Sequence, residues 1–125
     1  MQFQELLAYQ KSFSLAMKVY DISKSFPKEE IFALTDQIRR SSRSVSANIA
    51  EAYRKREYKK SYIHKLTDSD AENSETKVWL EFALECGYLE EELFNDLYND
   101  CDEVGKLLNY MMLNPQKFGV KMSKK

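Results

Sequence analysis

Residues that interrupt helices are rare in this sequence. Its 125 residues include three Gly and two Pro, too few to supply the turns of a many-stranded β fold. Leu, Ala, Glu and Lys are common instead, and these residues favour long helices. A chain of this length buries a core without disulfides or metal. We therefore expect one all-α domain.

Long hydrophobic runs are also missing. No apolar stretch approaches the roughly 18 residues that cross a membrane as a helix. Residues 1–10 lack the charged-then-apolar order of a signal peptide. These two absences predict a cytoplasmic protein that has no membrane partner.

Cysteine is scarce, and the two cysteines are far apart in the expected fold. The helical assignment below places Cys86 and Cys101 on one hairpin, with an axial offset on the order of 15 Å between them. This offset is too large for a disulfide. We expect both residues to be buried free thiols.

Side chains for enzymatic chemistry are scarce too. His64 is the only histidine, so a catalytic triad would have to be built on it. A di-iron bundle needs Glu three residues before the histidine, and Ser61 stands there. No glycine-rich phosphate loop is present. We predict a protein that is not an enzyme and binds no metal or cofactor. One alternative stays open, because four carboxylates could bind Mg²⁺ or Ca²⁺: those of Glu51, Asp68, Glu72 and Glu75.

Helical periodicity is what the sequence does contain. Apolar residues recur at helical spacing in four segments, and the expected helices cover residues 4–25, 27–56, 59–86 and 90–113. Pro27 suits the first turn of the second helix, and Gly87 ends the third as a left-handed residue. The boundary near Glu57 has no Gly or Pro, so one continuous helix is the alternative there.

Short connections between these helices predict an antiparallel up-down-up-down four-helix bundle over residues 1–113. Residues 114–125 carry lysines and few apolar side chains, so we expect a flexible basic C-terminal tail. The expected inner stripes of the first two helices consist of Leu6, Tyr9, Phe13, Leu15, Met17, Val19, Tyr20, Ile22, Phe26, Ile31, Leu34, Ile38, Val45 and Ala52. Those of the other two consist of Tyr62, Ile63, Leu66, Val78, Trp79, Leu80, Phe82, Ala83, Leu93, Leu97, Val104, Leu108 and Met111.

Polar residues also fall on the seam of the second helix. Ser41 and Asn48 share the a/d spacing of Val45 and Ala52. Buried polar groups must be hydrogen-bonded, and their best-supported use in helical assemblies is to fix register and partner. We therefore expect Asn48 to be a buried amide that specifies assembly. The predicted polar core or assembly set is Ser41, Asn48, Glu51, Ser69, Glu72 and Asn73.

The net charge of −1 hides an uneven distribution. Residues 1–65 contain 13 Lys or Arg and 7 Asp or Glu, whereas residues 66–125 contain 6 and 13. The predicted nucleic-acid-binding cations are Arg39, Arg40, Arg43, Arg54, Lys55, Arg56, Lys59 and Lys60. Pairing of these cations with acidic groups of the same or a neighbouring subunit is the alternative. Because no aromatic sheet is available for bases, the first interpretation predicts phosphate contact without sequence reading.

Three groups of residues carry a resemblance to a known family. They are Phe26-Pro27, then Gln37-Ile38-Arg39-Arg40 with Ser44 and Asn48-Ile49-Ala50-Glu51, and finally Trp79-Leu80 before Gly87-Tyr88-Leu89. From Phe3 to about Leu113 the chain resembles the four-helix-bundle proteins encoded in intervening sequences of bacterial 23S rRNA genes. The resemblance implies a homo-oligomer, with pentameric rings among its forms, no established enzymatic activity and a suspected role in RNA binding. Similar bundles are accessory proteins of reverse transcriptases in diversity-generating retroelements.

Two functional hypotheses follow. The first is a non-enzymatic, oligomeric bundle that acts as an RNA or ribonucleoprotein accessory and contacts phosphates through the basic residues of the second helix. The second is a protein-interaction scaffold whose charged faces serve self-assembly and docking only, because a head-to-tail ring brings unlike surfaces together at every contact.

Overall fold

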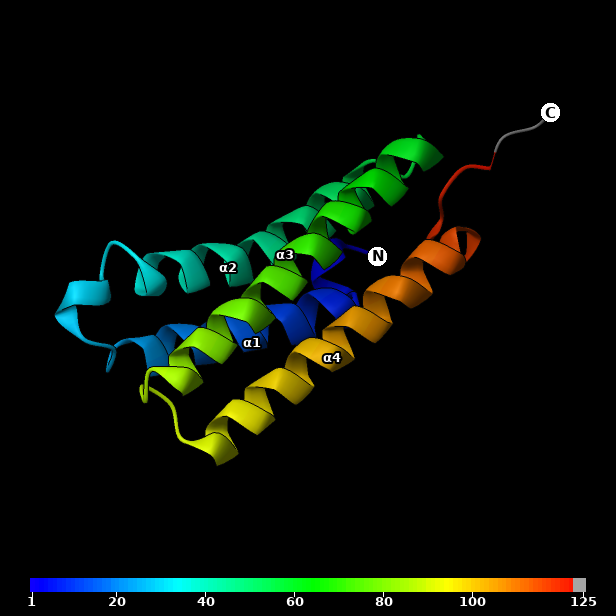
Figure 1. Cartoon of the computed structure of the whole chain (residues 1–125). Coiled ribbons are helices and arrows are strands. Elements are labelled where there is room, and N and C mark those ends of the chain that lie inside the picture. The colour runs from blue at the N-terminus through cyan, green and yellow to red at the C-terminus, as the bar shows by residue number, and fades with distance from the viewer. Residues whose placement is uncertain (123–125) are drawn as a thin grey trace.

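The computed structural model describes residues 1–122, which form a bundle of four long helices (Figure 1). These helices are α1 (Leu7–Ser23), α2 (Leu34–Arg54), α3 (Lys59–Glu85) and α4 (Glu91–Leu113). Three short 3₁₀ helices accompany them: η1 (Phe3–Glu5), η2 (Lys28–Glu30) and η3 (Pro115–Phe118). Consecutive long helices run in alternating directions in Figure 1, so the bundle has the expected antiparallel up-down-up-down order.

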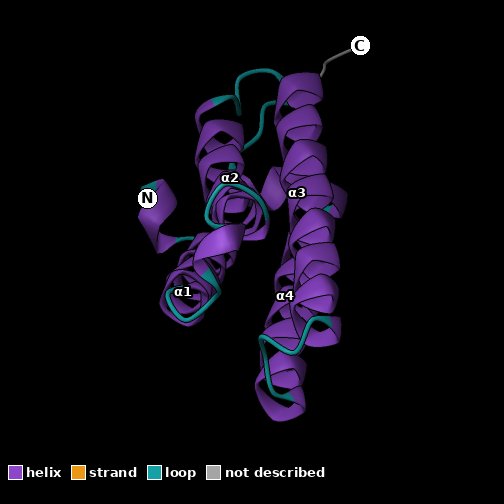
Figure 2. Cartoon of the chain, turned by 60° about the vertical axis from the view of Figure 1, so that its left-hand side comes forward, coloured by secondary structure: helices purple, strands orange, loops and turns teal. Residues whose placement is uncertain are grey.

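Each long helix packs against two others. The α1–α2 hairpin lies beside the α3–α4 hairpin (Figure 2), with α2 against α3 and α1 against α4. No strand occurs in residues 1–122. In that same range no helix is long and apolar enough to cross a bilayer.

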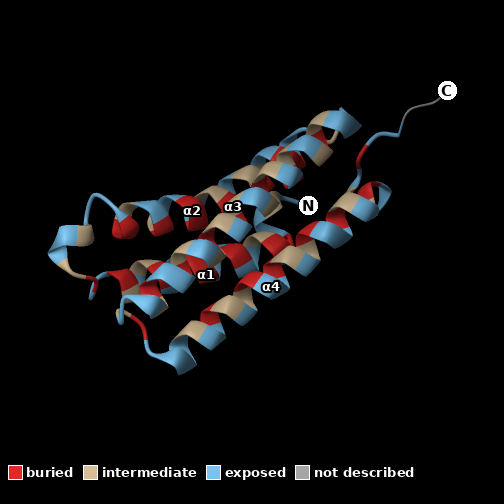
Figure 3. Cartoon of the chain, viewed as in Figure 1, coloured by how far each residue is buried: buried red, intermediate tan, exposed pale blue. Residues whose placement is uncertain are grey.

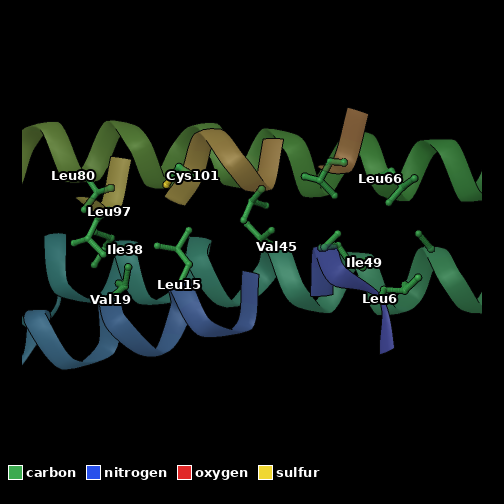
Figure 4. Close-up of a cluster of buried hydrophobic side chains, with 14 of the residues drawn as sticks. Leu6, Leu15, Val19, Ile38, Val45, Ile49, Leu66, Leu80, Leu97 and Cys101 are labelled. Carbon is green, nitrogen blue, oxygen red and sulfur yellow. The ribbon is translucent and has the colours of Figure 1, made fainter. Parts of the chain in front are cut away.

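One continuous apolar cluster fills the space between the hairpins. Buried residues lie along the inward faces of the helices in Figure 3, and Figure 4 shows their side chains meeting. Val19, Ile38, Leu66 and Leu80 have no exposed surface, and they come from three different helices. Burial of each such side chain stabilises the fold by roughly 1.5–3 kcal/mol relative to exposure.

Gly87 ends α3 in the predicted way. Its φ of 80° is in the left-handed region, which costs glycine nothing. The Gly87 N–H donates to the Leu84 carbonyl at 3.0 Å, and the Tyr88 N–H donates to the Ala83 carbonyl at 2.8 Å. These two bonds are the Schellman motif. The turn between α3 and α4 is therefore determined locally.

The start of α2 differs from the prediction, because the helix begins at Leu34 and not at Pro27. Residues between them form η2 and a turn. One oxygen of the Glu30 carboxylate accepts the Leu34 N–H at 3.2 Å, and the other accepts the Tyr88 hydroxyl at 2.8 Å. Tyr88, from the distant α3–α4 turn, thus holds the Glu30 carboxylate that accepts the first N–H of α2. Ile31 precedes the helix and is 48% exposed, not buried as predicted.

The apolar stripes are narrower than predicted. A helix on the surface of a bundle turns only a limited arc toward the core, and residues at the edge of the stripe remain open to solvent. Besides Ile31, five residues predicted as inner are more than a third exposed: Phe13, Met17, Val78, Phe82 and Leu93.

Part of the predicted flexible tail is docked instead, against the connection between α2 and α3. The Arg56 guanidinium donates to the Phe118 carbonyl at 3.2 Å, and the Lys121 N–H donates to the Arg56 carbonyl at 2.9 Å. Pro115 and Val120 are buried. Composition indicates that a segment cannot fold alone, but it does not show whether the segment docks on a core that already exists. Residues 123–125 of the predicted tail lie outside the described residues.

Candidate nucleic-acid interface

The structure separates the eight predicted cations into two groups. Arg39, Arg40 and Arg43 lie in the middle of α2, whereas the other five lie at its end and at the start of α3. Arg54 stands eleven positions after Arg43, which corresponds to about 16 Å along a helix. The eight side chains therefore do not form one surface.

In the middle group, Arg39 and Arg43 contact α1, whereas Arg40 pairs within α2. The Arg39 Nε donates to the Ser23 hydroxyl at 2.7 Å, and its guanidinium lies 4.8 Å from the centre of the Tyr20 ring. Arg43 lies 5.6 Å from the same ring, and Arg40 is 3.9 Å from the Asp36 carboxylate. Arg39 is thus a structural link between two helices.

Four of the five residues in the second group form a surface that we call the basic tip, defined by Arg54, Lys55, Lys59 and Lys60. All four residues are exposed. The structure ends α2 at Arg54 and begins α3 at Lys59, although no Gly or Pro lies between them. The predicted break between the two helices is therefore present, and the alternative of one continuous helix is wrong. A tight connection between two helix ends therefore concentrates four cations.

The basic tip has a local excess of positive charge. Residues 51–65 contain six Lys or Arg side chains and two Glu, a net charge of +4. Glu51 forms an ion pair with Lys65, and their charged atoms are 2.7 Å apart. Their hydrogen bond raises the pKa of Lys65 above its usual value. No ion pair within residues 1–122 involves a residue of the basic tip.

The helix dipoles at the tip act in opposite senses. Arg54 and Lys55 stand at the negative end of α2, where cations are favourable. Lys59 and Lys60 stand at the positive end of α3, where a cation is unfavourable by about 0.3–1 kcal/mol. No acidic residue occupies the first turn of α3, and no side chain caps it. An anion would complement both the free amides and the lysines.

An open hollow accompanies these charges. Its volume is about 450 Å³, and it is lined by Lys55, Lys60, Ser61, His64 and Lys65. A phosphate group that enters this hollow meets lysine ammonium groups and a serine hydroxyl, which are common phosphate partners. The hollow thus has the chemistry of a phosphate-contact site.

Two contributors to this region were not identified from the sequence. The docked C-terminal segment brings Lys121, whose ammonium lies 3.1 Å from the Glu57 carboxylate. Tyr58 is 67% exposed between the two helix ends. Its aromatic ring lies in the middle of the basic sequence, a signal that a search for aromatic residues next to cations would have found. Arg56, in contrast, packs 3.6 Å from the Tyr53 ring centre and is structural.

Three residues of the predicted polar set lie inside the bundle. Ser41 shares a hydrogen bond of 2.8 Å with Thr76. The Ser69 hydroxyl donates to the Val45 carbonyl at 2.8 Å, and the Asn73 amide donates to the Cys101 carbonyl at 2.9 Å. These bonds join α2 to α3 and α3 to α4. Thr76 is not in the predicted polar set.

The other three residues of that set are not buried, and the prediction of a buried Asn48 amide is wrong. A step of four from Val45 places Ile49 inside, whereas Asn48 is half-buried and accepts a hydrogen bond from Lys65 at 3.5 Å. Glu51 is exposed. Glu72 is half-buried, and burial raises its pKa, with Glu75 and Asp68 adding to the effect.

A further buried pair was missed in the sequence. Ser12 and Ser46 share a hydrogen bond of 2.9 Å between α1 and α2. Ser12 stands three residues before Leu15 and seven before Val19, so it belongs to their stripe. A search for serine at apolar positions would have found it.

We expect Thr76→Val to lower the free energy of unfolding by about 1–2 kcal/mol. The change keeps the shape of the side chain but leaves the buried Ser41 hydroxyl with a single 3.4 Å contact to the Ile38 carbonyl. Urea unfolding followed by circular dichroism measures the effect. Thr67→Val is the matched control at an exposed position, where the change should stay within about 0.5 kcal/mol. Equal effects at the two sites would show that the buried bond is not stabilising.

The structure also places the candidate metal ligands and the two thiols. No group of three or more His, Cys, Asp or Glu side chains within residues 1–122 is placed to hold a metal ion. Cys101 is buried, and burial raises its thiol pKa to about 12. Cys86 is exposed, which corrects the prediction that both thiols are buried.

Comparisons with known proteins find one matching family model and a similar solved structure. The family model described as 23S rRNA-intervening sequence protein matches residues 4–110. A crystal structure from Bacteroides thetaiotaomicron, of a protein with unknown function from the S23 ribosomal protein family, is 30% identical and has a TM-score of 0.78. That similarity covers 86% of this chain and 96% of the other. No curated protein matches the sequence.

Proposed function

Because the chain belongs to the family of 23S rRNA-intervening sequence proteins, we propose that it is a non-enzymatic, self-assembling accessory of RNA or ribonucleoprotein. In this proposal the basic tip contacts the phosphate backbone. The single observation that carries it is the set of four exposed cations around an uncapped helix start, with no ion pair to them in residues 1–122.

The cations of the basic tip and the neighbouring Tyr58 ring favour structured RNA with unpaired nucleotides. Lysine and arginine contact phosphates without reading sequence. The exposed Tyr58 ring offers a surface on which an unpaired base can stack. A duplex has no such base available, so an RNA hairpin should bind more tightly than a duplex of equal length.

The first test is RNA-hairpin binding measured by fluorescence anisotropy over a salt series. With four phosphates neutralised, log K should fall with log salt at a slope of about −3. A duplex of equal length is the comparison. Absence of binding at low ionic strength, or binding that ignores salt, would contradict the proposal.

A second candidate is the protein-interaction scaffold. It is favoured by the acidic opposite end of the bundle, where Glu90, Glu91 and Glu92 surround the start of α4. A head-to-tail contact between copies would bring this end toward the basic tip. An oligomer that sediments as one species but does not bind the hairpin would favour the scaffold.

A further inference from the structure

The connection between α1 and α2 carries an exposed apolar knob, consisting of Ile31 and Phe32. Phe32 is 94% exposed and Ile31 is 48% exposed. Figure 1 shows this light-blue segment projecting beyond the helices at the left. Phe32 is almost uncovered by its own chain, so its apolar ring and the neighbouring Ile31 side chain are available for a contact with another molecule.

An apolar groove lies farther along the same hairpin. It is about 370 Å³ in volume and is bounded mainly by Tyr9, Phe13 and Met17 of α1 with Arg43, Ala47 and Ala50 of α2. Phe13 and Met17 are each about half exposed. The small side chains of Ala47 and Ala50 leave the room that an aromatic ring can fill.

The knob cannot occupy the groove of its own chain. Phe32 precedes the first residue of α2, Leu34, and Ala47 stands thirteen residues after Leu34. This separation is about 20 Å along the helix. Only a second molecule can therefore bring the two surfaces together.

The charges beside the two surfaces are complementary. Glu29 precedes the knob and is exposed, and Arg43 lines the groove. Neither residue takes part in an ion pair within residues 1–122. If the knob enters the groove of another copy, Glu29 approaches Arg43 of that copy, which favours this partner and this orientation.

We propose that Ile31 and Phe32 of one copy insert into the α1–α2 groove of a second copy. The inference rests on the self-assembly in the proposed function and names the surfaces that perform it. Because the knob and the groove are different surfaces, the contact is head-to-tail, and repetition closes into a ring or extends as a chain.

The test uses one variant for each surface. Phe32→Asp removes the knob and keeps the groove, whereas Ala47→Glu blocks the groove and keeps the knob. Each variant alone should lose self-association by about 10- to 100-fold, because apolar burial is lost. An equimolar mixture should form a 1:1 dimer and nothing larger, since one intact knob meets one intact groove. Sedimentation velocity measures both results.

Controls separate this inference from the proposed function. Phe82→Asp changes an aromatic residue of α3 that is 54% exposed, and this variant should assemble like the parent. Circular dichroism should show equal helicity in all variants. Variants that assemble like an oligomeric parent, or that stay monomeric when mixed, would overturn the knob and groove while self-assembly stands. A parent that is monomeric at every concentration would overturn the proposed self-assembly as well.

Discussion

A protein carrying Lys55→Glu and Lys59→Glu is expected to bind the RNA hairpin at least about 100-fold more weakly than the parent at low salt. Each exposed charge pair contributes on the order of 1 kcal/mol, and reversal replaces an attraction by a repulsion of similar size. Two reversals therefore remove roughly 3–4 kcal/mol, where 1.4 kcal/mol is a factor of ten. The salt slope should also become shallower by about 1.4–1.8, because two phosphates are no longer neutralised.

The control for this prediction is a variant with the same change in net charge, made outside the basic tip. Lys24→Glu and Lys106→Glu alter two exposed lysines away from the basic tip. This variant should retain most of the affinity and the full salt slope. If it loses as much affinity as the tip variant, net charge governs RNA binding, and the tip has no special role.

The largest expected effect on stability is that of Leu80→Ala, about 3–5 kcal/mol. Leu80 has no exposed surface and points into the buried cluster near Leu97 and Ile38 (Figure 4). The substitution loses apolar burial and leaves a cavity, because helices joined by short connections cannot fully close around it. A loss of this size is a large fraction of the roughly 5–15 kcal/mol that stabilises a typical domain.

Leu113→Ala is the matched control, since Leu113 is 70% exposed at the end of α4. We expect it to change the free energy of unfolding by less than about 0.5–1 kcal/mol. Guanidinium unfolding at one protein concentration compares the two variants. A Leu80→Ala protein as stable as Leu113→Ala would mean that the core repacks around the missing side chain.

The sequence by itself determined the features that depend on neighbouring residues. Helical periodicity predicted all four long helices, and Gly87 predicted the end of α3 by its freedom in the left-handed region. The break between α2 and α3, from Arg54 to Lys59, was predicted to within two residues. These features are local, because hydrogen bonds within a helix and φ preferences act over a few residues.

Only the tertiary structure decided which faces meet. Tyr88 holds Glu30 and thereby sets the start of α2, and Phe118 meets Arg56 across a gap of 62 residues. Asn48 lies beside Lys65 because packing against α3 sets the rotation of α2 about its axis. Such contacts join residues far apart in the chain, and their energies depend on how four helices fill one core. For the same reason the sequence predicted eight nucleic-acid-binding cations, whereas the fold brings only four of them together in the basic tip.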